Sequence, residues 1–225
     1  MIKGIVFDFD GLIIDTESAW YEALKEIYEE HEAYLPLETW VKCVGTSHDA
    51  FDPYLHLQEI LERPVDMEEL KQIVAQKHDW IMQARDLRPG VESYLQAAQQ
   101  LGLKIGIASS SHRAWVERFT HQFNIYDYFS CMRTADYVEK VKPDPELYVQ
   151  ALEALDLQPE EAIAFEDSPN GAKAAHAAGL HVVIVPNTVT GELTFGPHVL
   201  RLNSMADQTL EEVIAAVQSK HQSSI

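Results

Sequence analysis

Length, composition and charge place this chain among folded, acidic globular proteins. It has 225 residues, of which 46% are hydrophobic and 24% charged, enough for one large domain or for one domain with an insertion. The formal net charge of -19 argues against binding to the phosphate backbone of nucleic acids, which requires clustered Lys and Arg. A small phosphorylated ligand remains compatible with this charge if cations such as a metal ion are placed locally.

The predicted elements begin with a short apolar strand over residues 2–9. From residue 16 to residue 84, apolar side chains such as Trp20, Leu24 and Ile27 recur at helical spacing, and short apolar β runs are absent. Prolines and glycines divide this stretch into expected helices over residues 17–32, 37–44, 50–61 and 67–83.

From residue 87 onward, helices and short buried strands alternate. The expected helices cover residues 91–101, 115–123, 146–155, 170–178 and 210–218, and the expected strands cover residues 104–108, 129–133, 162–165, 181–185 and 199–202. This alternation predicts parallel strands joined by helical crossovers. We therefore expect an α/β fold with a doubly wound, mostly parallel, Rossmann-like sheet built from residues 1–15 and 86–225. Residues 16–85 are expected to form an α-helical cap, inserted after the first strand.

Polar residues follow several of these strands, at the edge where open α/β sheets bind ligands. Asp8 and Asp10 end the first strand and point to the same side, where their charges repel unless a cation or proton is shared. The later strands are followed by three serines, one lysine and two acids: Ser109 to Ser111, Lys142, Glu166 and Asp167. Each alone could be a helix cap or a solvated side chain. Their joint placement favours one functional site.

This set of side chains suits phosphoryl transfer through a covalent intermediate. One aspartate would attack phosphorus, and a hard cation with oxygen ligands, expected to be Mg²⁺, would neutralise the carboxylates and the phosphate. A lysine and a hydroxyl would bind the transferring oxygens. A second carboxylate would protonate the leaving oxygen and then deprotonate water.

Four of these segments resemble, in the same order, the motifs of the haloacid dehalogenase-like (HAD) hydrolases. They are Asp8-Phe9-Asp10-Gly11, Ser109, Lys142-Pro143, and Glu166-Asp167-Ser168-Pro169-Asn170-Gly171. The resemblance covers essentially the whole chain, because the helical insertion is similar to the cap of that family. It is closest to the β-phosphoglucomutase-like, phosphatase-rich subgroup.

The resemblance implies a role for each motif residue. Asp8 would be the nucleophile and a metal ligand, and Asp10 the general acid/base, with its backbone carbonyl on the metal. Asp167 would be the third protein ligand of Mg²⁺, and Glu166 would adjust the metal shell. The phosphoryl group would be held by Lys142 and Ser109, with Ser110 beside it. Thr16 and residues 87–90 would form the hinge between core and cap.

Differences within the family favour hydrolysis. Dehalogenase members lack the second aspartate, so Asp10 points to phosphate chemistry. Mutase members carry a cap histidine at the place of Trp20 and an arginine near the place of His48. Trp20 cannot transfer a proton, and a neutral His48 is a poor substitute for the bidentate fork of arginine. We therefore expect a Mg²⁺-dependent phosphatase acting on a small phosphorylated metabolite of the sugar phosphate or nucleotide type. The alternatives are a phosphosugar mutase and a phospho-accepting signalling or binding protein.

The cap is expected to set specificity, with Glu17, Trp20 and His48 as candidate substrate contacts. Tryptophans at helical spacing, including Trp80, are more typical of a helical core. On the same expected helix, Lys77 and His78 are more typical of a solvated face.

The remaining expectations concern redox state and location. Cys43 and Cys131 show no CxxC spacing, which predicts two reduced thiols. The N-terminus has no signal-peptide pattern, and no apolar run approaches the ~20 residues that a membrane helix needs. We expect a cytoplasmic monomer with neither a membrane nor a nucleic acid as partner.

Overall fold

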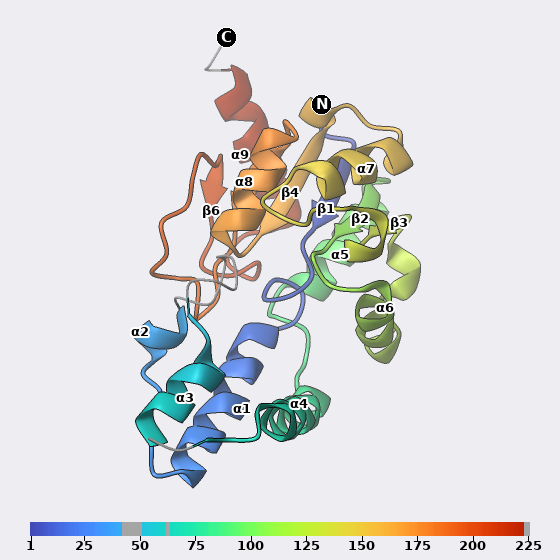
Figure 1. Ribbon diagram of the computed structural model, residues 1–225. Coiled ribbons are helices and arrows are strands. Elements are labelled where there is room, and N and C mark those ends of the chain that lie inside the picture. The colour runs from blue at the N-terminus through green and yellow to red at the C-terminus, as the bar shows by residue number, and fades with distance from the viewer. Residues whose placement is uncertain (42–50, 62–63, 223–225) are drawn as a thin grey trace.

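The main body of the computed structural model, which describes residues 1–41, 51–61 and 64–222, is a six-stranded parallel sheet covered by helices (Figure 1). The strand order is β3-β2-β1-β4-β5-β6, and every neighbouring pair is parallel. The strands are β1 (Gly4–Phe7), β2 (Lys104–Ala108), β3 (Cys131–Arg133), β4 (Ala162–Glu166), β5 (His181–Ile184) and β6 (Leu200–Arg201). The predicted doubly wound parallel sheet is confirmed.

Helices cover both faces of this sheet because its buried strands are apolar on both sides. Ile5 and Phe7 of β1 pack into one core cluster, whereas Val6 between them packs into the other, as the alternation of a strand requires. The first cluster contains buried residues of α5 (Val91–Gln100), α6 (Arg113–Gln122) and α9 (Leu210–Gln222). The second contains those of α7 (Glu146–Leu155) and α8 (Pro169–Ala177). Short 3-10 turns at Tyr126–Tyr128, Ala135–Tyr137 and Pro159–Glu161 were not predicted.

The segment between β1 and α5 is helical, as predicted, and its helices gather beyond one end of the sheet (Figure 1). They are α1 (Thr16–Glu30), α2 (Leu37–Trp40), α3 (Pro53–Leu61) and α4 (Met67–Gln83). Side-chain caps begin two of them, since Asp15 accepts from the amide of Ser18 and Asp66 from those of Glu68 and Glu69. These caps place the starts of α1 and α4.

The third helix of this segment begins later than predicted, at Pro53 rather than residue 50. Proline suits a first helical position because it has no amide to leave unpaired, and Asp52 accepts from the amides of Tyr54 and Leu55. The expected helix over residues 37–44 is described only as α2, which ends at Trp40. Its remainder lies outside the described residues, as do His48 and Cys43. The described Cys131 is a free thiol, as predicted.

The two connections between sheet and helices run side by side. Ile14 and Leu87 form an antiparallel bridge, and the amide of Arg88 donates to the carbonyl oxygen of Ile13 over 2.9 Å. The guanidinium of Arg88 also donates to the carbonyl oxygens of Gly11, Val185 and Pro186. Arg88 therefore ties the predicted hinge to the loops after β1 and β5. Among the described helices, none combines the length and apolar character needed to cross a membrane.

Candidate active site

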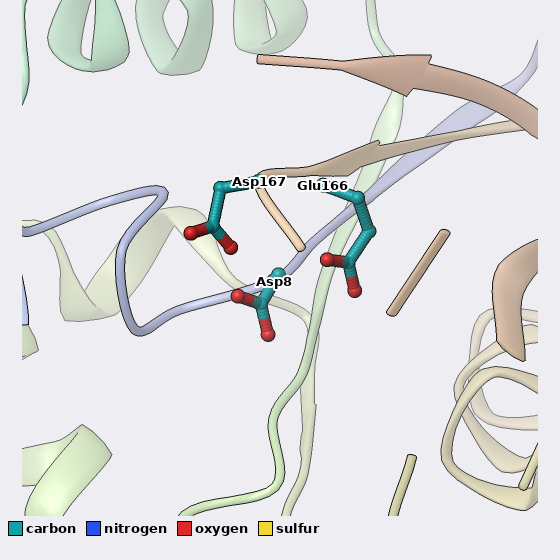
Figure 2. A group of neighbouring side chains, drawn as sticks. All are labelled: Asp8, Glu166 and Asp167. Atoms are coloured by element: carbon teal, nitrogen blue, oxygen red, sulfur yellow. The ribbon is translucent and has the colours of Figure 1, made fainter. Parts of the chain in front are cut away.

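Three buried carboxylates meet at the carboxyl ends of the neighbouring strands β1 and β4. Phe7 and Phe165 are paired in the sheet, so the residues that follow, Asp8 and Glu166, come out side by side. With Asp167, they each offer an oxygen that lies within 4.8 Å of the others (Figure 2). The strand order reverses between β1 and β4, and such reversal points are where open α/β sheets bind ligands.

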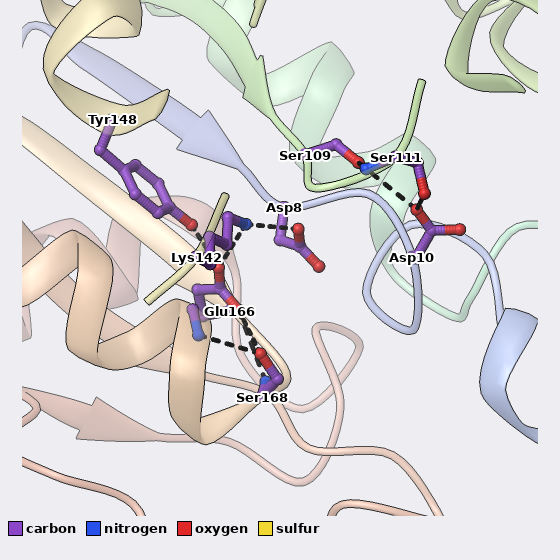
Figure 3. Close-up of polar contacts among 9 residues, drawn as sticks. Asp8, Asp10, Ser109, Ser111, Lys142, Tyr148, Glu166 and Ser168 are labelled. Atoms are coloured by element: carbon purple, nitrogen blue, oxygen red, sulfur yellow. Dashed lines mark hydrogen bonds and ion pairs between the residues drawn. The ribbon is translucent and has the colours of Figure 1, made fainter. Parts of the chain in front are cut away.

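Lys142 joins two of these carboxylates. Its Nζ lies 2.5 Å from Asp8 Oδ1 and 2.6 Å from Glu166 Oε1, and its side chain is only 5% exposed (Figure 3). The lysine precedes α7, and the Lys142–Pro143 peptide bond is cis. From α7, the hydroxyl of Tyr148 donates to Glu166 Oε1, and the ring centroid of Tyr148 lies 4.9 Å from the ammonium. A single cation is thus held between the sheet and one helix.

The electrostatics of this cluster are those of acids removed from water. Burial raises the pKa of Asp8, although Lys142 opposes the shift. Burial and the nearby Asp8 raise the pKa of Glu166 to about 7, again against Lys142. The pKa of Asp167 is raised well above its usual value by burial, Asp8 and Glu166. Burial alone would lower the pKa of Lys142, but the carboxylates of Asp8 and Glu166 raise it above its usual value. One lysine does not balance three acids.

Asp167 carries an oxygen with no partner. Its Oδ2 accepts from Asn187 Nδ2 at 2.7 Å, whereas its Oδ1 is buried and unpaired. The side-chain amide of Asn187 is itself oriented, because its Oδ1 accepts from the backbone amides of Val189 and Thr190. A buried, unpaired carboxylate oxygen is costly unless something binds it. An oxygen-only donor set beside two further carboxylates fits a Mg²⁺ ion.

Two glycines leave room for these carboxylates. Gly11 has φ +78°, and a Cβ atom there would lie 2.2 Å from Asp167 Oδ2. A Cβ atom at Gly171 would lie 2.0 Å from Glu166 Oε1. The N-terminal turn of α8 thereby approaches Glu166 closely, and the Ser168 side chain caps that turn by accepting from the amide of Gly171. Any larger residue at either of these motif positions would therefore clash with a carboxylate of the site.

The side chain of Asp10 is held by a different group of residues. Ser111 Oγ donates to Asp10 Oδ2 at 2.7 Å, and Ser109 Oγ lies 3.4 Å from the same oxygen (Figure 3). Asp10 Oδ1 accepts from the indole Nε1 of Trp115 at 2.8 Å. Of the predicted serines, Ser109 is buried at this place, whereas Ser110 is exposed and gives none of the contacts described for Asp10. The structure thus separates the two aspartates of the first motif into two groups.

The predicted residues of the helical segment over residues 16–85 differ in how deeply they are buried. Glu17 lies in the first turn of α1, and burial followed by the charges of Asp10, Asp15 and Asp8 raises its pKa to about 7. The indole of Trp20 stacks on the imidazole of His78, with ring centroids 3.8 Å apart. The expectation that His78 is solvated was wrong, since it is 2% exposed.

A second expectation for the cap was also wrong. Trp80, expected in the core, is 71% exposed. His78 and Trp80 lie two positions apart on α4, about 200° around the helix axis, so one faces inward when the other faces outward.

Three residues near the site were not identified from the sequence, namely Trp115, Tyr148 and Asn187, and Arg88 was identified only as part of the predicted hinge. The sequence did contain a sign of Asn187, because this polar residue comes three positions after the end of β5, at the same edge of the sheet as Asp8 and Asp167. The sequence indicated Tyr148 less clearly, through the general need of a buried tyrosine hydroxyl for a hydrogen-bond partner. The contacts of Arg88 and Trp115 depend on how separate segments pack, and nothing in their spacing indicates them.

The strand order, the acidic cluster at the reversal point and the buried lysine define a doubly wound α/β protein with a candidate site of oxygen ligands at the ends of its strands. The family model described as "Haloacid dehalogenase-like hydrolase" matches residues 5–185. The chain belongs to this family, and the predicted membership and fold class are confirmed.

Individual relatives agree with this assignment. The chain is 48% identical to the Bacillus subtilis protein named "Putative phosphatase YhcW" over 98% of this chain and all of the relative. It is 28% identical to the "Phosphorylated carbohydrates phosphatase" of Thermotoga maritima, over 95% of this chain and 97% of the relative. A crystal structure titled "putative beta-phosphoglucomutase from Thermotoga maritima" superposes with a TM-score of 0.77 at 25% identity, covering 95% of this chain and 99% of the other. The predicted subgroup is thereby confirmed, and the names of both curated relatives support the prediction of a phosphatase.

Proposed function

We propose that this protein is a Mg²⁺-dependent phosphatase that hydrolyses a small phosphorylated metabolite, of the sugar phosphate or nucleotide type, through a phosphorylated Asp8. One observation carries the proposal: Lys142 bridges Asp8 and Glu166, which form a buried cluster with Asp167, and Asp167 Oδ1 has no partner. The relative that acts on phosphorylated carbohydrates supports the sugar phosphate class.

In the first half of the reaction, a carboxylate oxygen of Asp8 attacks phosphorus and the bond to the leaving oxygen breaks. The ammonium of Lys142, 2.5 Å from Asp8 Oδ1, orients the nucleophile and offsets its charge, and it can also bind a transferring oxygen. Ser109 is the proposed hydroxyl for the same phosphoryl group. Ser110, which is exposed, is a weaker candidate than its neighbours.

Asp10 is proposed as the general acid and base. It donates a proton to the leaving oxygen in the first step and accepts one from the attacking water in the second, which releases phosphate and restores Asp8. The carboxylate of Asp10 is held by Ser111 and Trp115, whereas that of Asp8 is held by Lys142. The two carboxylates therefore have different partners, as two distinct roles require.

Mg²⁺ would be held by side-chain oxygens of Asp8 and Asp167 and by the backbone carbonyl of Asp10, with Glu166 beside them. When bound, it would neutralise the carboxylates and the phosphate. The unpaired oxygen of Asp167 supports this assignment.

We further propose that residues 16–85 act as a cap over this site, with the rest of the chain as the catalytic core. The paired segments at Ile14 and Leu87 would form the hinge. Glu17 and Trp20 are the proposed cap contacts with substrate, together with His48, which lies outside the described residues. The stacking of Trp20 on His78 supports hydrolysis over mutase chemistry, because it gives the indole a packing role. A cytoplasmic monomer remains part of the proposal.

The test is release of inorganic phosphate from a panel of sugar phosphates and nucleoside monophosphates, with Mg²⁺ and with EDTA. We expect turnover of a subset of the esters, lost in EDTA and restored by excess Mg²⁺. A ³²P-labelled ester should label the protein with an acyl phosphate that hydroxylamine releases. Absence of turnover across the panel would contradict the phosphatase, and rapid isomerisation of a hexose 1-phosphate would favour the mutase instead.

A further inference from the structure

A tryptophan of the core holds one carboxylate oxygen of Asp10. The indole Nε1 of Trp115 donates to Asp10 Oδ1 at 2.8 Å, while Ser111 occupies the other oxygen at 2.7 Å. An indole nitrogen can only donate, so this bond fixes which atom faces the carboxylate. Both oxygens of Asp10 are thereby oriented by the segment between β2 and the first turn of α6.

The other side of Trp115 is in contact with the cap. Its ring lies 5.6 Å from the ring of His78 at an interplanar angle of 22°, and His78 in turn stacks on Trp20 with centroids 3.8 Å apart at 9°. Trp20 belongs to α1, His78 to α4 and Trp115 to α6, so the stack joins two cap helices to one core helix. Figure 1 shows α6 extending from the sheet toward α4.

The middle ring of this stack is buried and uncharged. His78 is 2% exposed, and its Nε2 has no partner among the described residues. Burial lowers the pKa of His78 to about 4, so the ring is neutral at physiological pH and can pack between two indoles. An ion pair lies beside the stack, with Arg118 of α6 3.0 Å from Asp79 of α4.

We propose that Trp115 is a positioning residue, which orients the carboxylate of Asp10 and couples that orientation to the cap through the Trp20–His78–Trp115 stack. The inference rests on the proposed function, since it assumes that Asp10 transfers protons. A shift of the cap that moves His78 displaces the indole, and the indole carries the hydrogen bond on Asp10. The position of the cap therefore affects the orientation of Asp10, and with it the proton-transfer step, through Trp115.

The kinetic test compares Trp115→Phe with Trp80→Phe. Phenylalanine keeps a ring in the stack but loses the donor, whereas Trp80 is 71% exposed on α4 and serves as a matched control. We expect kcat of Trp115→Phe to fall about tenfold with KM within about twofold, because general acid/base catalysis contributes roughly 10²- to 10⁴-fold and only its orientation is impaired. Trp80→Phe should match the wild type. Equal kcat values for the two variants would overturn the positioning role.

The second test needs no substrate and uses indole ¹H–¹⁵N resonances of the ¹⁵N-labelled protein, assigned through the Trp→Phe variants. The Trp115 indole proton should move upfield in Asp10→Ala, which removes the acceptor, and should also shift in His78→Leu, while the Trp80 resonance stays in place. If the Trp115 resonance does not move in Asp10→Ala, the hydrogen bond between Trp115 and Asp10 is overturned. If the Trp115 resonance does not move in His78→Leu, the coupling of Trp115 to the cap is overturned. If the wild type hydrolyses no ester, the proposed function fails, while these spectra still decide the contact itself.

Discussion

The sheet edge and the helical segment proposed as the cap hold their side chains in different ways. At the edge, Asp8, Lys142 and Glu166 bind one another through charges supplied by two strands and a loop. On the cap, Trp20 and His78 are held mainly by ring stacking. A network of buried charges fails when one member is removed, whereas stacked rings tolerate replacement by rings of similar size. The groups assigned to bond making are therefore fixed by the core, and those assigned to specificity can vary.

The largest expected effect is on the proposed nucleophile. Asp8→Asn should lower phosphate release by at least roughly 10³-fold, because an amide cannot form the acyl phosphate. Circular dichroism should show a retained fold. The exposed Asp127→Asn is the control and should keep full activity. Substantial turnover in Asp8→Asn would remove Asp8 from its role.

The next effect contrasts a buried lysine, Lys142, with a partly exposed one, Lys77. Lys142→Met leaves Asp8 and Glu166 without their shared counter-charge and should lower the free energy of unfolding by about 3 kcal/mol. Lys77→Met breaks surface pairs with Glu26 and Glu30 and should cost less than about 1 kcal/mol. Urea unfolding of both variants measures the difference. Equal losses of unfolding free energy would mean that the ion pairs of Lys142 contribute no more to stability than the surface pairs of Lys77.

A smaller effect is expected where the backbone of α8 approaches Glu166. Gly171→Ala places a methyl group on the Glu166 carboxylate and should destabilise the protein by about 2 kcal/mol through overpacking. Gly196→Ala is the control, since a Cβ atom there would have no described residue within 4 Å apart from its chain neighbours. Thermal unfolding followed by circular dichroism distinguishes them, and a neutral Gly171→Ala would show that Glu166 can move aside.

The smallest effect is a pH dependence from the cap. The pKa of His78 is lowered from 6.5 to about 4 by burial, so the unfolded chain binds more protons between these values. Stability from the neutral ring is present above pH 6.5 and is lost as pH falls toward 4, by about 1 kcal/mol between pH 7 and 5.5.

Removing the titrating ring should remove this slope. His78→Gln is therefore expected to be less stable at pH 7 but to lose less stability on acidification, as urea unfolding at both pH values would measure. The exposed His198→Gln should keep the wild-type slope. An unchanged slope in His78→Gln would show that His78 does not titrate on unfolding.

Much of the site could be predicted because its residues follow successive strands. A parallel sheet brings strand ends together whatever covers it, so Asp8, Lys142, Glu166 and Asp167 were expected at one edge and are found there. The same reasoning, carried one strand further, would have included Asn187. The hydrogen bond between Asp10 and Trp115 could not be predicted in this way, because Trp115 lies on a helix and not at the end of a strand.

The cap shows where reasoning from the sequence ends. Helical spacing located α1 and α4, but it did not indicate that His78 is buried and Trp80 exposed. Both positions are compatible with an amphipathic helix, and the choice depends on how α4 lies against α1 and α6.

The sequence by itself determined the order of elements, the parallel sheet and the acidic residues that end its strands. These follow from local periodicity and from the geometry of one chain passing repeatedly in the same direction. Only the tertiary structure decided that Lys142 bridges Asp8 and Glu166, that Asp167 keeps an unpaired oxygen, and that Trp115 links Asp10 to the cap. Such contacts join residues far apart in the chain, and packing between whole elements sets their distances.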